Sequence, residues 1–241
     1  MKLLVSKSEK IYYIKNTSQD FHCNEGTIRK EQFKKKSGSK ILTTTGNEFV
    51  LWDASFIDYY AKIKRAPQLI PRKDIGTIIT KCGINKQSIV VDAGTGSGGT
   101  AFFFASIAKK VYTYEIRQDF FKIAKENLKF FKLKNVVIKN KDVYQGIDEK
   151  NVDLVFLDVT EPWKAVQAAS NALKSGGFLV SYSPSTSQVS RFVKNVKKSK
   201  QFLLLKSVEL LERDWEFSGE ISRPKFQMLG HSGFLTFARK L

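Results

Sequence analysis

The chain has 241 residues, 42% of them hydrophobic and 27% charged, and this composition excludes wholesale disorder because it supplies enough apolar material for a core. Lysine and arginine number 41 against 23 aspartate and glutamate residues, a formal net charge of +18. Such an excess favours a polyanionic partner, most commonly a nucleic acid, although a lysine-rich surface that serves only solubility is the alternative.

The positions of the cysteines and the hydropathy of the sequence exclude further classes of protein. Cys23 and Cys82 lie far apart and form no CxxC pair, so the sequence indicates neither a disulfide framework nor a metal site. No apolar run reaches the roughly 18 residues of a membrane-spanning helix, and the N-terminus lacks a signal-peptide pattern. We expect a cytoplasmic protein with no membrane segment and no metal.

Residues 1–60 are expected to form a small β-rich module. Short strand-like runs are separated by turns rich in Gly, Asn and Lys: Lys10–Lys15, Lys40–Thr44 and Glu48–Trp52. A polar stretch, Lys62–Pro67, follows, and Pro67 and Pro71 are expected to mark the boundary to a second domain over residues 65–241.

From Ile75 onward, strand-like runs alternate with helix-like stretches, the pattern of a parallel sheet built from βαβ units. Five parallel strands are predicted: Ser88–Ala93, Val111–Ile116, Val136–Lys139, Val152–Asp158 and Phe178–Ser183. Between them, Asp119–Phe131 predicts an amphipathic helix with Phe120 among its core residues. The final runs, Phe202–Phe217 and Gly233–Lys240, predict an antiparallel hairpin that closes the sheet. The fold class is therefore α/β, with a Rossmann-like sheet.

A glycine-rich segment, Val90–Gly99, ends the first of these strands and opens a helix. Glycines there permit a tight turn and let a ligand approach the backbone closely, which predicts a nucleotide-like ligand. The spacing alone leaves two ligands open. One glycine triplet matches the dinucleotide pattern and another matches the pattern of S-adenosylmethionine (SAM) enzymes, the two triplets being Gly94, Gly96, Gly99 and Gly94, Gly96, Gly98.

Acidic residues at the ends of successive strands help to decide between these two ligands. Asp92 suits a ligand with an ammonium and a sulfonium group and would repel a pyrophosphate. Glu115 can accept hydrogen bonds from both hydroxyls of a ribose, and Asp142 from an adenine amino group. Asp158 ends the fourth strand, where a simple helix cap is the other interpretation. Either cofactor would use an acid at Glu115, but the three acids Asp92, Glu115 and Asp142 on successive strand ends together favour SAM over NAD.

With these motifs in place, the sequence resembles the tRNA (adenine-N1)-methyltransferases that modify the T-loop, in their single-subunit archaeal and bacterial form. The matching segments are Gln68–Asp74, Asp92–Gly98, Tyr114–Arg117, Lys141–Gly146, Leu157–Trp163, Leu173–Tyr182 and Arg223–Lys240. The resemblance is close over residues 65–241 and loose before them. It implies a SAM-dependent methyltransferase domain, methyl transfer to N1 of a T-loop adenine of the position 57/58 type, tRNA as partner and a homotetramer.

The resemblance and the strand-end acids together define a candidate site. Residues expected to bind SAM are Gln68, Asp92, Gly94, Gly96, Ser97, Gly98, Gly99, Glu115, Ile116, Asp142, Val143 and Asp158. Asp158 is the candidate catalytic residue, because a carboxylate that accepts a hydrogen bond from the adenine 6-amino group would stabilise the cationic product. Pro71, Trp163 and His231 are candidate substrate contacts. Pro71 stands where the family tends to carry an aromatic residue or histidine, and His231 is equally compatible with a structural role.

Two other functional classes remain open at this stage. A protein methyltransferase of the isoaspartyl type shares the glycine motif but requires neither the positive charge nor the Leu157–Trp163 segment. A non-catalytic RNA-binding subunit would explain the charge but would leave the four strand-end acids without a role.

Overall fold

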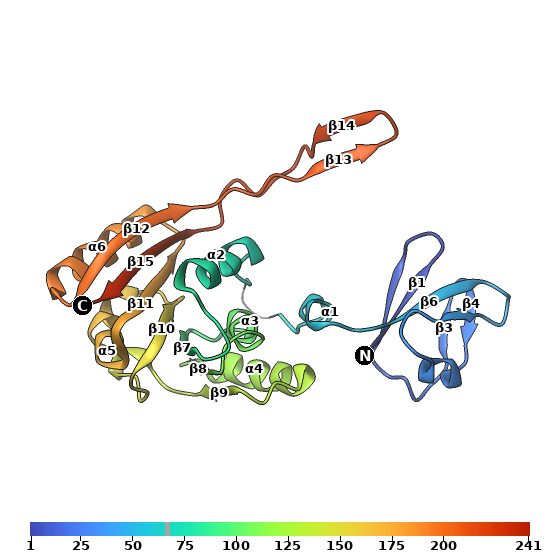
Figure 1. Cartoon of the computed structure of the whole chain (residues 1–241), viewed down its shortest axis with the longest axis horizontal. Coiled ribbons are helices and arrows are strands. Elements are labelled where there is room, and N and C mark those ends of the chain that lie inside the picture. Colours follow the sequence, from blue (N-terminus) through green and yellow to red (C-terminus); the bar gives the residue numbers. More distant parts are fainter. Residues whose placement is uncertain (66–67) are drawn as a thin grey trace. The chain divides into compact units, whose positions relative to one another are not determined.

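The computed structural model describes residues 1–65 and 68–241, and these divide into two compact units, Met1–Ile63 and Lys64–Leu241 (Figure 1). Pro67, which the sequence analysis places at the domain boundary, lies outside the described residues. Over the described ranges, no helix is both long and apolar enough to cross a membrane.

The first unit is built around an antiparallel sheet in the order β2-β1-β6-β5. Its strands are β1 (Lys2–Ser6), β2 (Ile11–Ile14), β5 (Lys40–Leu42) and β6 (Glu48–Asp53). A ribbon of β3 (Phe21–Cys23) and β4 (Gly26–Ile28), a short 3-10 helix η1 (Lys30–Lys34) and helix α1 (Phe56–Ala61) complete it. Alternation along the strands buries Leu4, Phe49 and Leu51 in one small core. The β-rich N-terminal module is confirmed, although α1 was not anticipated.

The second unit contains a seven-stranded sheet in the order β12-β15-β11-β10-β7-β8-β9. Its strands are β7 (Ile89–Ala93), β8 (Lys110–Tyr114), β9 (Val136–Lys139), β10 (Val152–Leu157), β11 (Leu173–Ser183), β12 (Phe202–Glu209) and β15 (Phe234–Lys240). The five predicted strands are mutually parallel, and β15 pairs antiparallel with both β11 and β12. The predicted α/β fold with a terminal antiparallel pair is confirmed.

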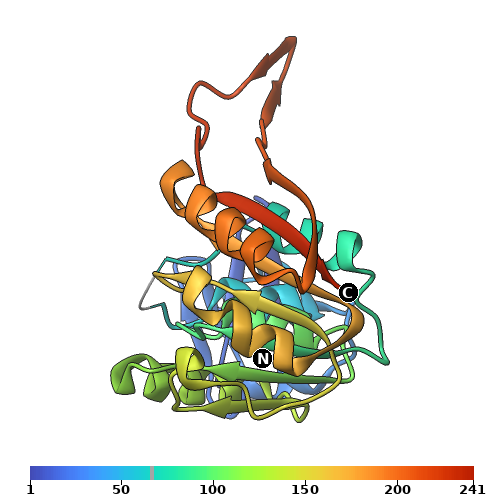
Figure 2. The ribbon, with the colours of Figure 1, turned by 90° about the vertical axis from the view of Figure 1, so that its left-hand side faces the viewer.

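Helices cover both faces of this sheet (Figure 2). They are α2 (Arg72–Cys82), α3 (Gly99–Ala105), α4 (Gln118–Phe131), α5 (Val166–Ala172) and α6 (Thr186–Ser199), with 3-10 turns η2 (Val143–Gln145) and η3 (Pro162–Ala165). The central strand β10 is apolar without interruption from Leu154 to Leu157, because side chains on both of its faces are buried. Val155 and Leu157 pack in the core that includes α5 and α6, while Phe156 points the other way and meets Phe104 of α3 edge-on at 5.8 Å.

The predicted strand Phe202–Phe217 is wrong in its extent. β12 ends at Glu209, and the chain then leaves the sheet as a separate ribbon of β13 (Trp215–Ser218) and β14 (Ile221–Pro224). Figures 1 and 2 both show this ribbon projecting beyond the β12–β15 pair. All four residues of β13 are exposed, so its apolar side chains do not belong to the core that the sequence pattern indicated.

Candidate active site

The glycine turn joins the end of β7 to the start of α3. Gly98 has φ of +89°, and a Cβ at this position would lie 2.4 Å from Cζ of Phe102, so only glycine fits. The backbone N–H of Gly96 donates to Oε2 of Glu115 at 2.8 Å, and the N–H of Arg117 donates to Oε1 at 2.9 Å. Glu115 therefore fixes the turn to the end of the neighbouring strand.

A cavity of about 740 Å³ opens at this carboxyl edge of the sheet, within the size range of small-molecule sites. Most residues expected to bind the cofactor line it, namely Gln68, Gly94, Gly96, Ser97, Gly99, Glu115, Ile116, Asp142, Val143 and Asp158. The two exceptions are Gly98, which closes the turn, and Asp92. The parallel topology thus brings the acids of four strand ends to one edge.

Asp92 is buried at the end of β7, with 1% of its surface exposed. Thr113 donates to its Oδ2 at 2.5 Å, whereas Oδ1 has no hydrogen-bond partner among the described residues. Burial, together with the charges of Asp158 and Glu115, raises the pKa of Asp92 to about 8. An orphaned carboxylate oxygen of this kind favours a cationic or hydrogen-bond-donating ligand.

Asp158 lines the cavity and is exposed there, while many protein atoms lie close to its carboxyl group and desolvate it. This desolvation and the charge of Glu115 raise the pKa of Asp158 to about 7. In the part of the chain that the structure describes, Asp92, Glu115 and Asp158 form no ion pair with a lysine or arginine. Arg117 interacts with the charge of Glu115 but forms its ion pair with Asp119. Three acids that form no ion pair with a basic residue fit the cationic SAM and would repel the phosphates of a dinucleotide.

Asp142 lines the cavity and caps a short helix beside it. Its Oδ1 accepts from the N–H of Tyr144 at 2.9 Å, which caps η2. The Tyr144 hydroxyl accepts in turn from the N–H of Glu161 at 3.0 Å, so the loops after β9 and β10 are joined beside the cavity. Tyr144 and Glu161 also line the cavity, a role that the sequence analysis did not assign to them.

The prediction that Phe120 belongs to the hydrophobic core is wrong. The ring is only half-buried and lines the cavity, with the Arg117 guanidinium 3.7 Å from its centroid. Ala124 on the same helix face is fully buried, as expected. The first turn of α4 extends past the core to the cavity. The amphipathic pattern of the helix does not show where core-facing residues give way to cavity-lining residues.

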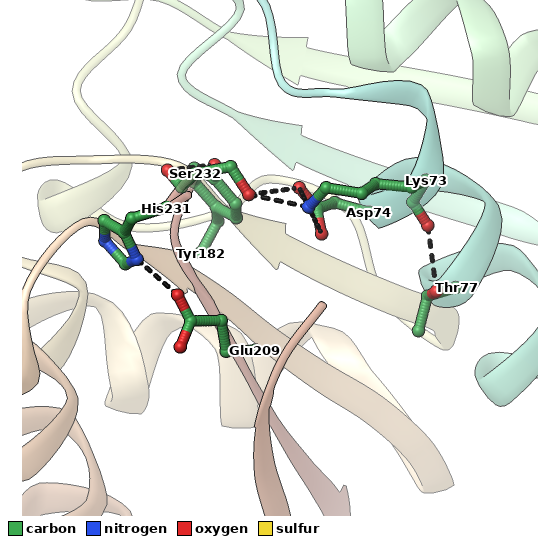
Figure 3. A network of polar contacts seen from close by, with 7 residues as sticks. All are labelled: Lys73, Asp74, Thr77, Tyr182, Glu209, His231 and Ser232. Atoms are coloured by element: carbon green, nitrogen blue, oxygen red, sulfur yellow. Dashed lines mark hydrogen bonds and ion pairs between the residues drawn. The ribbon is translucent and has the colours of Figure 1, made fainter. Parts of the chain in front are cut away.

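The three candidate substrate contacts are not among the residues that line the cavity. Pro71 precedes the first turn of α2, and its carbonyl accepts from the N–H of Asp74 at 3.0 Å. Trp163 lies on η3, with the Arg191 guanidinium 5.4 Å from its ring. His231 lies at the root of the β13–β14 ribbon, where Nδ1 contacts Glu209 at 2.5 Å (Figure 3). Its Nε2 contacts the Pro184 carbonyl at 2.8 Å.

A mostly parallel Rossmann-like sheet, a glycine turn and acidic strand ends around one cavity define a SAM-dependent methyltransferase. Within that class, the chain belongs to the family of the tRNA methyltransferase complex GCD14 subunit, which matches residues 60–220.

Individual relatives agree with this assignment. The chain is 33% identical to the tRNA (adenine(57)-N(1)/adenine(58)-N(1))-methyltransferase TrmI of Methanocaldococcus jannaschii, over 99% of this chain and 94% of that protein. The crystal structure of the tRNA (m1A58) methyltransferase TrmI from Aquifex aeolicus has a TM-score of 0.81 and 28% identity, covering 100% of this chain and 96% of that one. A structure described as a SAM-dependent O-methyltransferase from Thermotoga maritima has a TM-score of 0.86 and 31% identity, covering 100% and 92% of the two chains.

Proposed function

We propose that this protein transfers the methyl group of SAM to N1 of an adenine in the T-loop of tRNA. The observation that carries the proposal is the position of Asp158, a carboxylate without a basic partner that lines the cavity of a chain belonging to a tRNA methyltransferase family. The Methanocaldococcus jannaschii relative is named for this reaction at adenines 57 and 58, and the Aquifex aeolicus structure is named for it at adenine 58.

The chemistry suits the residues of the cavity. SAM supplies a methyl group activated by its sulfonium. Glu115 and Asp142 are the proposed partners of the ribose and the adenine amino group. Asp92, which is not among the lining residues, has a carboxyl oxygen without a hydrogen-bond partner in the described part of the chain, two residues before the first glycine of the turn. N1 of adenine attacks with its own lone pair, so no strong base is required. Asp158 would accept a hydrogen bond from the 6-amino group and stabilise the positive charge that develops on the base.

The direct test uses unmodified tRNA, SAM and the purified protein, followed by mapping of methylated nucleosides. We expect 1-methyladenosine in the T-loop. Asp158→Ala should lower methyl transfer by about 100-fold or more, as for loss of a preorganised electrostatic contact. An isoaspartyl peptide serves as the alternative acceptor, and its methylation in place of tRNA would reject the proposal. Binding of tRNA without any SAM-dependent product would point to a non-catalytic RNA-binding subunit.

The positive charge supports tRNA as the partner. If lysines and arginines contact phosphates, the logarithm of the tRNA association constant should fall linearly with the logarithm of salt concentration. Deletion of residues 1–60 should weaken tRNA binding more than SAM binding, because every residue that lines the SAM cavity follows this segment. A flat salt plot would contradict phosphate binding.

The β13–β14 ribbon supports a second proposed partner, another copy of the same chain. Residues 210–230 contain four acidic and three basic residues, a nearly neutral segment in a chain of net charge +18. They also expose large apolar side chains, among them Trp215, Phe217 and Phe226, the last with 84% of its surface exposed. An isolated two-stranded ribbon is only marginally stable in water, so a second copy that covers this surface would stabilise it.

Light scattering of Phe217→Ser and Phe226→Ser variants tests this association. We expect a homo-oligomer, a tetramer on the pattern of the family, for the unchanged chain and smaller particles for the variants. Phe130→Ser, which alters a partly buried aromatic residue on α4, is the matched control. A monomeric unchanged chain would reject self-association and leave the proposed catalysis intact.

A further inference from the structure

Asp74 is a fully buried carboxylate outside the cavity lining, and a residue far along the chain completes its hydrogen bonding (Figure 3). It lies in the first turn of α2, where Nζ of Lys73 donates to both of its oxygens at 3.0 Å. Oγ of Ser232 donates to Asp74 at 3.0 Å and accepts from Lys73 at 2.7 Å. The buried ion pair is therefore fully satisfied only when the segment around Ser232 is docked against α2.

That segment in turn holds Tyr182 of β11. The Tyr182 hydroxyl donates to the carbonyl oxygen of Ser232 at 2.5 Å. The next residue, Gly233, packs directly on the ring, because a Cβ there would lie 2.4 Å from Cζ of Tyr182. The phenol is thus fixed by a hydrogen bond and by backbone contact with residues 232–233, and these residues are fixed by Asp74.

Tyr182 stands beside the strand that carries Asp158. In the parallel register of β10 and β11, Leu157, the last residue of β10, pairs with Ser181. Asp158, directly after β10, and Tyr182 of β11 are therefore the next residues along the two segments. Side chains at equivalent positions of neighbouring strands project to the same side of a sheet. Burial and the charges of Asp74 and Asp158 raise the pKa of Tyr182 to about 12, so the hydroxyl remains a donor at neutral pH.

We propose that Asp74 and Ser232 are positioning residues for methyl transfer, which hold the Tyr182 phenol in place beside Asp158. The inference rests on the proposed function, because this placement affects catalysis only if Asp158 acts on the acceptor base. A buried ion pair contributes little net stability relative to well-packed apolar residues. Here it joins two residues separated by 158 positions in the chain and sets the geometry of a third.

The test compares hydroxyl variants of one residue. Ser232→Ala removes the link to Asp74, and Ser232→Thr keeps it. Thr77→Val is the matched control, because the Thr77 hydroxyl donates to the Lys73 carbonyl within α2. We expect Ser232→Ala to lower kcat for tRNA by roughly 10- to 100-fold, the effect of a small misplacement of an active-site group. SAM affinity should stay within about twofold, and the Thr and Val variants should resemble the wild type.

A readout that is independent of activity follows Tyr182 itself. In protein labelled with 3-fluorotyrosine, the ¹⁹F resonance lost in Tyr182→Phe identifies this residue. That resonance should shift or broaden in Ser232→Ala and stay in place in Thr77→Val. In a Tyr182→Ala background, Ser232→Ala should cause no further loss of kcat.

The outcomes separate the two proposals. An unmoved resonance and an unchanged kcat in Ser232→Ala, with an active wild type, would overturn the positioning role alone. A further loss of kcat in the Tyr182→Ala background would show that Ser232 acts on catalysis by another route. A moved resonance in a protein that methylates no tRNA would reject the proposed function and retain the anchoring of Tyr182.

Discussion

Thr113 and Asp92 are directly paired across the parallel strands β8 and β7, and the Thr113 hydroxyl donates a 2.5 Å hydrogen bond to Oδ2 of Asp92. Oγ1 of Thr113 also lies 2.6 Å from Oγ1 of Thr95 in the glycine turn. One oxygen of a buried carboxylate is thereby satisfied from the neighbouring strand. The other finds no partner among the described residues and is directed to ligand binding in our proposal.

Asp92→Asn tests that proposal, because asparagine keeps the shape of the side chain and removes its charge. We expect the Kd for SAM to rise by about 10-fold or more, the range for hydrogen bonds to charged groups. Thr113→Val, which removes the donor to Oδ2 and the hydroxyl contact with Thr95 but leaves the charge of Asp92, should change SAM affinity less. Calorimetric titration measures both, and equal affinity of Asp92→Asn and wild type would remove Asp92 from the site.

The same variant should alter the pH dependence of stability. The folded-state pKa of Asp92, about 8, lies above its ordinary value of 3.8, so the folded protein binds a proton that the unfolded chain has released. Stability conferred by this group therefore falls as pH rises from about 4 to about 8. Thermal unfolding across this range should show a smaller decline in Asp92→Asn than in the wild type. Parallel curves would contradict a raised pKa.

Glu115 has a double role in our proposal, since it accepts from the glycine turn and faces the cavity. Glu115→Gln places an amide donor against the backbone N–H of Gly96 or Arg117. We expect SAM binding to weaken by roughly 1.5–3 kcal/mol. Asp119→Asn is the control, because this exposed acid pairs with Arg117 without contacting the turn. Calorimetry that shows the same loss in both variants would argue for a general charge effect.

The raised pKa of Asp158 predicts that cofactor binding depends on pH. Its pKa is raised to about 7 by burial and by Glu115, and a nearby cation favours the ionised form. SAM binding should therefore release protons near neutral pH, and affinity should increase between about pH 6 and pH 8. Titration in buffers of different ionisation enthalpy measures this release. Asp158→Asn should reduce it, and an undiminished release would assign the protons to other groups.

The fold was largely predictable because its central strands are buried on both faces. The centres of these strands, Leu154–Leu157 and Ile89–Val91, are continuously apolar, and the alternation with helical stretches indicates parallel pairing. The ribbon was not predictable. Trp215 and Phe217 alternate with charged or polar residues as they would in a half-buried strand, and no local pattern shows that nothing within the described unit covers them.

The candidate site was predictable where topology places it. Acids that directly follow parallel strands converge at one edge, so Glu115 and Asp158 could be grouped from the sequence. Phe120 could not, because helical periodicity does not distinguish a core face from a cavity wall. The Asp74–Ser232 contact joins segments 158 residues apart, and only the folded chain brings them together.

His231 provides the last prediction. Nδ1 faces the Glu209 carboxylate (Figure 3), and Nε2 faces the Pro184 carbonyl. Both oxygens can only accept, so the doubly protonated imidazolium satisfies both contacts. The contact with Glu209, followed by the one with Pro184, raises the pKa of His231 above its ordinary value of 6.5. The folded state therefore holds its proton more tightly than the unfolded chain. This contribution to stability is complete below pH 6.5 and is lost as pH rises through the folded-state pKa.

His231→Gln should lower the Tm relative to wild type more at about pH 6 than at about pH 9. His22→Gln, at an exposed histidine in the N-terminal unit, is the control. An equal loss of Tm at both pH values would show that the ring supports the ribbon root through packing against Phe234, whose ring centroid lies 5.0 Å away, rather than through its charge.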